Sequence, residues 1–154
     1  MSGRFVARQH SEKPVHLQTV IVGALAAVAI GCGAARAASP EEQRQVCAEA
    51  EQRYVESYGK PAKDEAVAVV MMFKHTFCPP SLTVKQGAKV RFVNVDRRTS
   101  HSFWFRDAGR PESERFFGGE SVEITVDLPT GEHSYLCGPH WQQEGMIGKL
   151  IVLP

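Results

Sequence analysis

The chain has 154 residues, with 18 Lys and Arg against 17 Asp and Glu and a formal net charge of +1. This length accommodates one domain and a processed leader, and it excludes multidomain enzymes and repeat arrays. The near-neutral charge provides no basic field of the kind that nucleic-acid-binding proteins use, so no nucleic-acid partner is expected. The sequence also lacks the glycine-rich motifs that cradle phosphate groups.

Residues 1–37 have the pattern of a signal peptide. A basic segment precedes an apolar run at residues 19–30, and small residues follow up to Ala37. This order predicts cleavage before Ala38 and export to the periplasm, with no membrane span after processing. One alternative is an uncleaved anchor, although the apolar run is shorter than the roughly 20 residues of a spanning helix. The other is a lipoprotein anchored through Cys32.

Three cysteines remain after the predicted cleavage, and the net charge of the mature chain becomes −2. An odd number of cysteines in an oxidising compartment indicates that one of them has another use. Cys47 falls on the apolar stripe of a predicted helix and Cys78 falls between predicted strands. A disulfide between them would link the helix to the sheet. Cys78 as a second metal ligand is the alternative.

Residues 38–60 are predicted to form one N-terminal α-helix. Ser39 is a suitable N-cap, Pro40 a suitable first helical residue, and Glu42 completes a capping box. Apolar residues then recur at steps of three and four, and Gly59 provides a C-terminal stop. The single apolar stripe must pack against another part of the protein.

Residues 65–154 are predicted to form an all-β domain, an antiparallel Greek-key β-sandwich. Short apolar or alternating segments separated by Gly, Pro and Asp are typical of such a fold. The predicted strands lie at residues 65–73, 81–84, 89–95, 101–105, 121–126, 133–137 and 148–153.

A group of metal-binding residue types lies near the C-terminus. Cys137, His140 and Met146 occur within ten residues, and His101 lies at the start of an earlier predicted strand. One thiolate, two imidazoles and a thioether match the trigonal His₂Cys copper site with a weak axial Met. Such a mixed shell suits both copper oxidation states, so these residues predict one copper ion and one-electron chemistry.

The same segment resembles the cupredoxins, the small blue copper proteins. It is most similar to the amicyanin, pseudoazurin and plastocyanin branch, in which Tyr-x-Cys-x-Pro-His is followed by Met. Tyr135, Cys137, Pro139, His140 and Met146 match this pattern. The resemblance covers about residues 73–154 and implies a cupredoxin sandwich with copper held by the four predicted ligands.

The sequence departs from the family pattern within this site. Five residues separate His140 from Met146, where the family more often has two to four. Gly138 and Ser102 stand where family members often carry a hydroxyl residue and Asn, whose side chains contact each other. A glutamine is an alternative axial ligand, either Gln142 or Gln143. Two other histidines match no ligand position and are interpreted as structural, namely His75 and His133.

The resemblance implies a periplasmic one-electron carrier. The electron would pass through the edge of His140, and Pro139 and Trp141 would provide apolar surface for transient docking. A c-type cytochrome or a periplasmic dehydrogenase would be a suitable partner. Trp104 belongs either to this surface or to the core. A strip of basic residues could steer an acidic partner or be solvated loop charge: Arg97, Arg98, Arg106, Arg110 and Arg115.

Two other functional classes compete with this interpretation. A copper oxidase or nitrite reductase would need a second copper site, and the mature chain has only His75 and His133 beyond the predicted ligands. The sequence therefore does not predict an enzyme. The second class is a protein for copper handling or delivery, which would need an exchangeable site.

Overall fold

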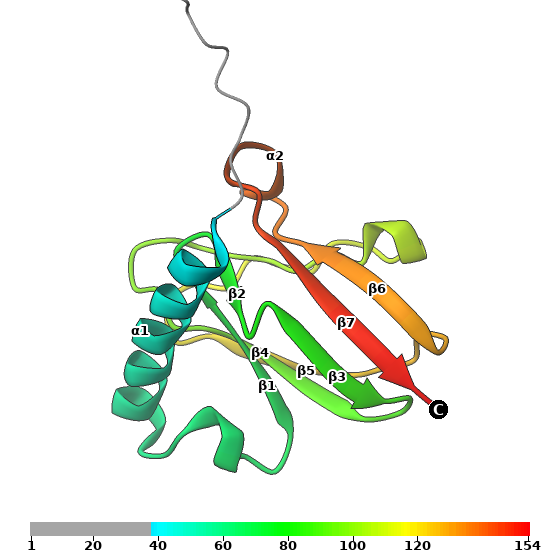
Figure 1. Ribbon diagram of the computed structural model, residues 1–154, viewed down its shortest axis with the longest axis horizontal. Helices are drawn as coiled ribbons and strands as arrows, with labels where there is room; N and C mark the ends of the chain where they lie inside the picture. The colour runs from blue at the N-terminus through cyan, green and yellow to red at the C-terminus, as the bar shows by residue number, and fades with distance from the viewer. Residues whose placement is uncertain (1–37) are drawn as a thin grey trace, which may run out of the picture. The chain divides into compact units, whose positions relative to one another are not determined.

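The computed structural model describes residues 38–154 (Figure 1). The predicted signal peptide and Cys32 lie outside the described residues. Within residues 38–154, no helix combines the length and the apolar character needed to cross a membrane. The elements in chain order are α1 (Pro40–Tyr58), η1 (Ala62–Asp64), β1 (Ala68–Phe73), β2 (Thr76–Cys78), β3 (Ser81–Lys85), β4 (Lys89–Asn94), η2 (Arg106–Ala108), β5 (Ser121–Thr125), β6 (Gly131–Leu136), α2 (Trp141–Glu144) and β7 (Ile147–Leu153).

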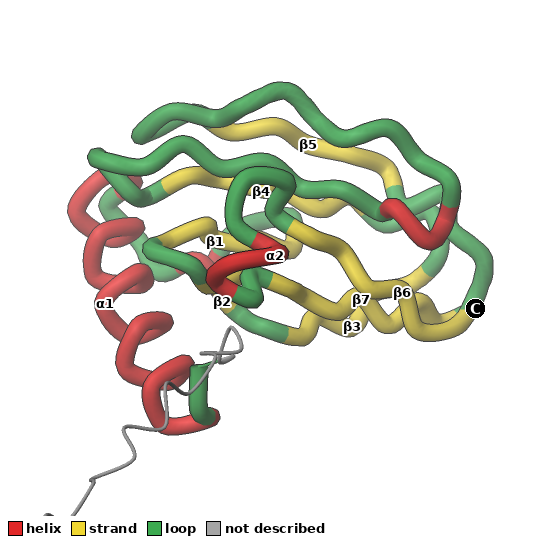
Figure 2. The backbone as a smooth tube through the Cα atoms, turned by 90° about the horizontal axis from the view of Figure 1, so that it is seen from above, coloured by secondary structure: helices red, strands yellow, loops and turns green. Residues whose placement is uncertain are grey.

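The strands form two sheets that pack face to face, as Figure 2 shows. One sheet has the order β2-β1-β4-β5 and the other the order β3-β7-β6. This confirms the predicted sandwich with one additional helix. The pairing is mixed rather than purely antiparallel, because β1–β4 and β3–β7 are parallel pairs. The cause is that β3 lies in the second sheet, so the chain returns to the first sheet as β4 running in the direction of β1.

The main core lies between the sheets and continues to the predicted metal ligands. Fully buried side chains of both sheets meet there, and the ring of Phe92 lies 5.5 Å edge-to-face from that of Tyr135. Cys137 and Met146 belong to the same buried cluster. The ligand region is therefore an extension of the core, and it is supported by close packing on the sheet side.

β1 is buried on both faces, which explains its continuous apolar sequence. Val70 and Met72 face the main core, whereas Val69 and Met71 belong to a second cluster with Tyr54 of α1. α1 thus covers the outer face of this sheet. The predicted capping box is present, since Ser39 Oγ accepts a hydrogen bond from the Glu42 N–H.

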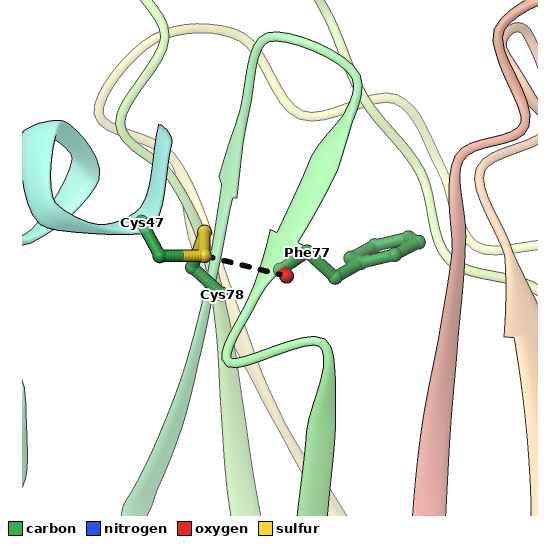
Figure 3. The surroundings of a disulfide bond; sticks show 3 residues. All are labelled: Cys47, Phe77 and Cys78. Carbon is green, nitrogen blue, oxygen red and sulfur yellow. Dashed lines mark hydrogen bonds between the residues drawn. A yellow bond between two sulfur atoms is a disulfide. The ribbon is translucent and has the colours of Figure 1, made fainter. Parts of the chain in front are cut away.

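A disulfide joins α1 to β2 (Figure 3). Cys47 and Cys78 are bonded, with their Cα atoms 5.2 Å apart. The Cys47 sulfur also lies 3.8 Å from the carbonyl oxygen of Phe77, whose ring belongs to the main core. The link attaches the helix to the sheet, as the positions of the two cysteines in the sequence suggested.

Two strand predictions differ from the structure. Residues 101–105 do not form a strand: His101 bridges to Phe116 and Trp104 bridges to Leu136. Because these single bridges reach two different partners, no continuous ladder forms. The short strand β2 was missed, since its three residues are all buried and offer no alternation.

Candidate metal centre

The predicted ligands gather at one end of the sandwich. His101 follows the end of β4, Cys137 follows the end of β6, and Met146 precedes β7. α2, at the same end in Figure 1, lies in the loop between Cys137 and Met146. Strand ends from both sheets therefore position the group, with His101 on one connection and the other three predicted ligands on the connection between β6 and β7.

Three donor atoms converge. The Cys137 sulfur lies 3.6 Å from His101 Nδ1 and 3.3 Å from His140 Nδ1. The ligand atoms of the three residues all lie within 4.8 Å of one another. Separations of this size are compatible with atoms that share one ion, because bonds of a metal such as zinc to imidazole nitrogen and thiolate sulfur are about 2.0–2.3 Å long.

Burial sets the charge state of these groups in the metal-free protein. His101 is fully buried, and desolvation together with the neighbouring His140 lowers its pKa to about 4. Desolvation also lowers the pKa of His140, helped by His75 and Arg115. Both imidazoles are thus kept neutral, the form that binds metals. Desolvation raises the pKa of Cys137, opposed by hydrogen bonds from Ser102 and His140.

The long loop between His140 and Met146 is closed by α2. This single helical turn ends at Gly145, whose φ of 65° lies in the left-handed region that glycine adopts without strain. The Met146 N–H then donates to the His140 carbonyl at 3.3 Å, and the Cys137 N–H donates to the Met146 carbonyl at 3.1 Å. The extra residues are absorbed in the turn, and Met146 returns to the site with its side chain fully buried.

The loop that carries His101 is fixed by two polar side chains. The buried Asn94 amide donates to the carbonyls of Thr99 and Phe116 at 2.8 and 2.9 Å. The carboxylate of Asp96 accepts from the backbone N–H groups of Lys74 and Arg98, both at 3.0 Å. These bonds tie the His101 loop to its neighbours.

Ser102 connects the two buried ligands. Its hydroxyl accepts a hydrogen bond from the Gly138 N–H at 3.0 Å and donates to Glu112 Oε1 at 2.6 Å. Ser102 follows His101, and Gly138 follows Cys137. The contact between the segments therefore exists although the side chains typical of the family are missing, and it uses Glu112, which the sequence did not indicate.

His75 is a second residue that contacts the site without any indication from the sequence. The predicted structural histidine packs its ring 4.9 Å from that of His140 and places Nδ1 3.3 Å from Glu144 Oε2. It lies in the turn between β1 and β2, so spacing along the chain carried no signal for the contact. The other such histidine, His133, contacts the Pro129 carbonyl instead.

The predicted docking residues surround the least buried ligand. Pro139, His140 and Trp141 are half-buried. The Arg106 guanidinium lies 4.7 Å from the ring centre of Trp141 and 5.8 Å from that of the half-buried Trp104. Trp104 is thus part of the surface near the site, with its indole N–H donated to a backbone carbonyl.

Of the five arginines in the basic strip, two contact other side chains and three form no ion pair within the described residues. Arg106 covers Trp141, and Arg110 pairs with Asp127 at 2.8 Å. The other three arginines are exposed and form no ion pair within residues 38–154: Arg97, Arg98 and Arg115.

Comparison with known proteins identifies the family. The cupredoxin-like domain family matches residues 24–152. The chain belongs to the cupredoxin-like family. Within it, the chain is 31% identical over 93 residues to the plastocyanin of Synechococcus sp. (strain JA-2-3B'a(2-13)), a match that covers 48% of this chain and 61% of that protein. It is 33% identical over 85 residues to the chloroplastic plastocyanin of Chlamydomonas reinhardtii, covering 49% and 57% respectively.

A solved structure of an oxidised amicyanin variant is also similar. It has 25% sequence identity and a TM-score of 0.50, and the match covers 60% of this chain and 89% of that one. This cupredoxin therefore lies in the amicyanin and plastocyanin branch. The chain spans about three fifths of the length of the curated plastocyanins that it matches.

Copper, the metal of this family, fits the donor atoms present. Cupredoxins bind one copper ion and include electron carriers. In this chain a buried cysteine outside any disulfide meets two neutral imidazoles, which is the donor chemistry that copper selects.

Proposed function

We propose that this cupredoxin is a one-electron carrier whose copper would be held by His101, Cys137 and His140, with Met146 as the fourth ligand. The proposal rests on one observation above all: two imidazole Nδ1 atoms converge on the sulfur of the buried Cys137.

Bound copper would supply exchange of one electron between Cu(II) and Cu(I). The protein contributes a fixed set of donors, because His101 and Cys137 are fully buried and the loop of His140 is closed by backbone hydrogen bonds. Burial excludes water from the sulfur side of the site. Donors that cannot move keep the reorganisation energy of electron exchange small.

Met146 is favoured over glutamine as the fourth ligand. Its side chain is fully buried beside Cys137, whereas Gln142 and Gln143 are exposed on α2. The burial of His101 and Cys137 also favours retention of the metal over its delivery. Copper handling remains the alternative function, and repeated oxidation and reduction in the presence of a Cu(I) chelator distinguishes them. A carrier keeps its copper, and a delivery protein loses it.

Partners would dock over the half-buried Pro139, His140 and Trp141. This surface is small and apolar, which suits the weak and transient contacts of electron transfer. A c-type cytochrome or a periplasmic dehydrogenase is a suitable partner. The electron would leave through the partly exposed edge of His140, since the other ligands are buried.

We place the mature protein, from Ala38, in the periplasm, with residues 1–37 as its signal peptide and residues 65–154 as the cupredoxin domain. The bond between Cys47 and Cys78 supports an oxidising compartment. N-terminal sequencing of protein from a periplasmic extract tests the location, and a chain that still starts at Met1 contradicts it.

The decisive experiment is the visible and electron paramagnetic resonance spectrum of the copper-loaded protein. We expect an intense blue thiolate-to-copper band and narrow copper hyperfine splitting, both lost in Cys137→Ser. His140→Gln should also lose them, whereas the matched control His133→Gln should keep them, because His133 lies at the start of β6 and contacts Pro129. A pale spectrum that Cys137→Ser leaves unchanged would overturn the proposal.

A further inference from the structure

Glu112 occupies the space that a side chain at position 138 would fill. A Cβ built on Gly138 would overlap three atoms of the Glu112 side chain, both carboxylate oxygens and the carbon between them. The carboxylate reaches this position from the loop after η2, and it accepts the hydroxyl proton of the fully buried Ser102 at 2.6 Å.

This contact fixes the direction of the Ser102 hydroxyl. A serine hydroxyl has one proton to donate, and here the proton goes to a carboxylate, which forms the stronger, charge-assisted bond. The oxygen of Ser102 is then free to accept from the Gly138 N–H at 3.0 Å. The hydroxyl proton is consequently directed to Glu112 rather than to the neighbouring Cys137 sulfur, which the Ser102 side chain also contacts.

We propose that Glu112 is a positioning residue that acts through Ser102 and Gly138 to hold the segments of His101 and Cys137 together and to set the hydrogen bonding of the thiolate. The inference rests on the proposed copper centre. Glu112 is exposed and is not a metal ligand, yet it would affect the reduction potential of the copper ion.

The direction of the effect follows from two contributions of the same sign. Removal of a negative charge near the metal disfavours Cu(II) relative to Cu(I). Loss of the carboxylate also lets the Ser102 hydroxyl donate more strongly to the Cys137 sulfur, which its side chain already contacts. Hydrogen bonds to this sulfur tune the potential of such sites. Both changes raise the potential, and the second also shifts the thiolate-to-copper band.

The experiment compares four variants of the copper-loaded protein by potentiometry and visible spectroscopy. For Glu112→Ala we expect the ratio of Cu(I) to Cu(II) at a fixed potential to rise about tenfold, which corresponds to about 59 mV for a one-electron couple. Glu112→Gln keeps an acceptor oxygen and should change less. Gly138→Ala displaces the carboxylate without removing its charge, so it should reproduce the shift of the thiolate-to-copper band but only part of the change in potential. Glu114→Ala is the matched control, since it removes an exposed charge two residues away that makes no contact with Ser102.

A rescue variant separates the hydrogen bond from the charge. In the double variant Glu112→Ala/Gly138→Ser, the new hydroxyl lies where the carboxylate was and can accept from Ser102. We expect the position of the thiolate-to-copper band to return toward that of the wild type. A double variant with the band of Glu112→Ala would overturn the assigned hydrogen-bonding role.

A readout in the copper-free protein is independent of the metal. The amide resonance of Gly138 should move, and its hydrogen exchange should accelerate, in Glu112→Ala but not in Glu114→Ala. If the wild type is blue and the two alanine variants behave alike, the inference is wrong and the proposed function stands. If the wild type is not blue, the proposed function fails, and the Gly138 amide still decides whether Glu112 holds the two segments.

Discussion

At two glycines near the metal centre, an added side chain would collide with a neighbouring residue. The two neighbours differ in how easily they can move. A Cβ on Gly138 would meet the end of the exposed Glu112 side chain, which can move aside. A Cβ on Gly148 would overlap Cζ, Cε2 and Oη of Tyr135, its cross-strand partner on β6. Tyr135 is fully buried between the sheets and cannot move without disturbing the core.

We predict that Gly148→Ala destabilises the protein by about 1–3 kcal/mol, because overpacking forces buried side chains and backbone to shift. Gly138→Ala should cost less than Gly148→Ala, because only the end of the exposed Glu112 side chain must move. Urea denaturation of both variants measures the difference. Equal costs at the two positions would show that the Tyr135 ring is not held rigidly.

At the scale of single residues, the sequence sufficed to predict the metal ligands but not the residues that contact and position them. Cys137, His140 and Met146 lie on one loop, so residue type and spacing sufficed to select them. Glu112 and His75 reach the site from other loops, through contacts that exist only in the folded chain. No pattern along the sequence distinguishes either from an ordinary surface residue.

At the scale of elements, α1 is attached to the sandwich by a covalent bond as well as by packing. The disulfide closes a loop between residues 31 positions apart. Tyr54 of α1 is fully buried and donates a hydrogen bond to Glu65 at 2.7 Å. The Cys78 end of the disulfide lies on β2, the strand that follows the turn carrying His75.

We predict that the double variant Cys47→Ser/Cys78→Ser loses about 4 kcal/mol of stability, the chain-entropy value for a loop of this length. The blue band should persist, since neither cysteine belongs to the donor cluster. Denaturation followed by both far-ultraviolet circular dichroism and the blue band measures the two properties together. The single variant Cys47→Ser should cost a similar amount, and loss of the blue band in the double variant would contradict the prediction.

Sequence patterns located most elements but not their pairing. The helix was predictable because its cap residues and apolar steps are local signals. The parallel pairs β1–β4 and β3–β7 depend on which sheet each strand joins, which is decided by long-range packing. Residues 101–105 include three consecutive aromatic residues, which strands favour, yet His101 and Trp104 bridge to different partners.

At the scale of the whole molecule, unpaired positive charge lies beside the metal centre. Arg97 and Arg98 are exposed in the loop that carries His101, and Arg115 precedes the bridge of Phe116 to His101. The two loops touch, because a Cβ on Gly118 would lie 2.9 Å from the Asp96 carbonyl oxygen. Phe117, two residues after Arg115, is 63% exposed. Such a surface suits a redox partner with an acidic docking face.

We predict that this charge accelerates electron exchange with anionic reagents. In Arg97→Gln/Arg98→Gln, the rate of oxidation by ferricyanide should fall about tenfold at low salt, within the range of electrostatic steering. The rate with a cationic cobalt complex should rise. The matched control Lys85→Gln/Lys89→Gln removes the same charge at the turn between β3 and β4, the far end of the strand that leads to His101. Its rates should stay close to those of the wild type.

Stopped-flow kinetics at several salt concentrations measures both variants. The difference between them should vanish near 1 M salt, where the screening length is about 3 Å. Equal effects of the two variants would show that net charge alone, rather than its position beside His101, governs the encounter.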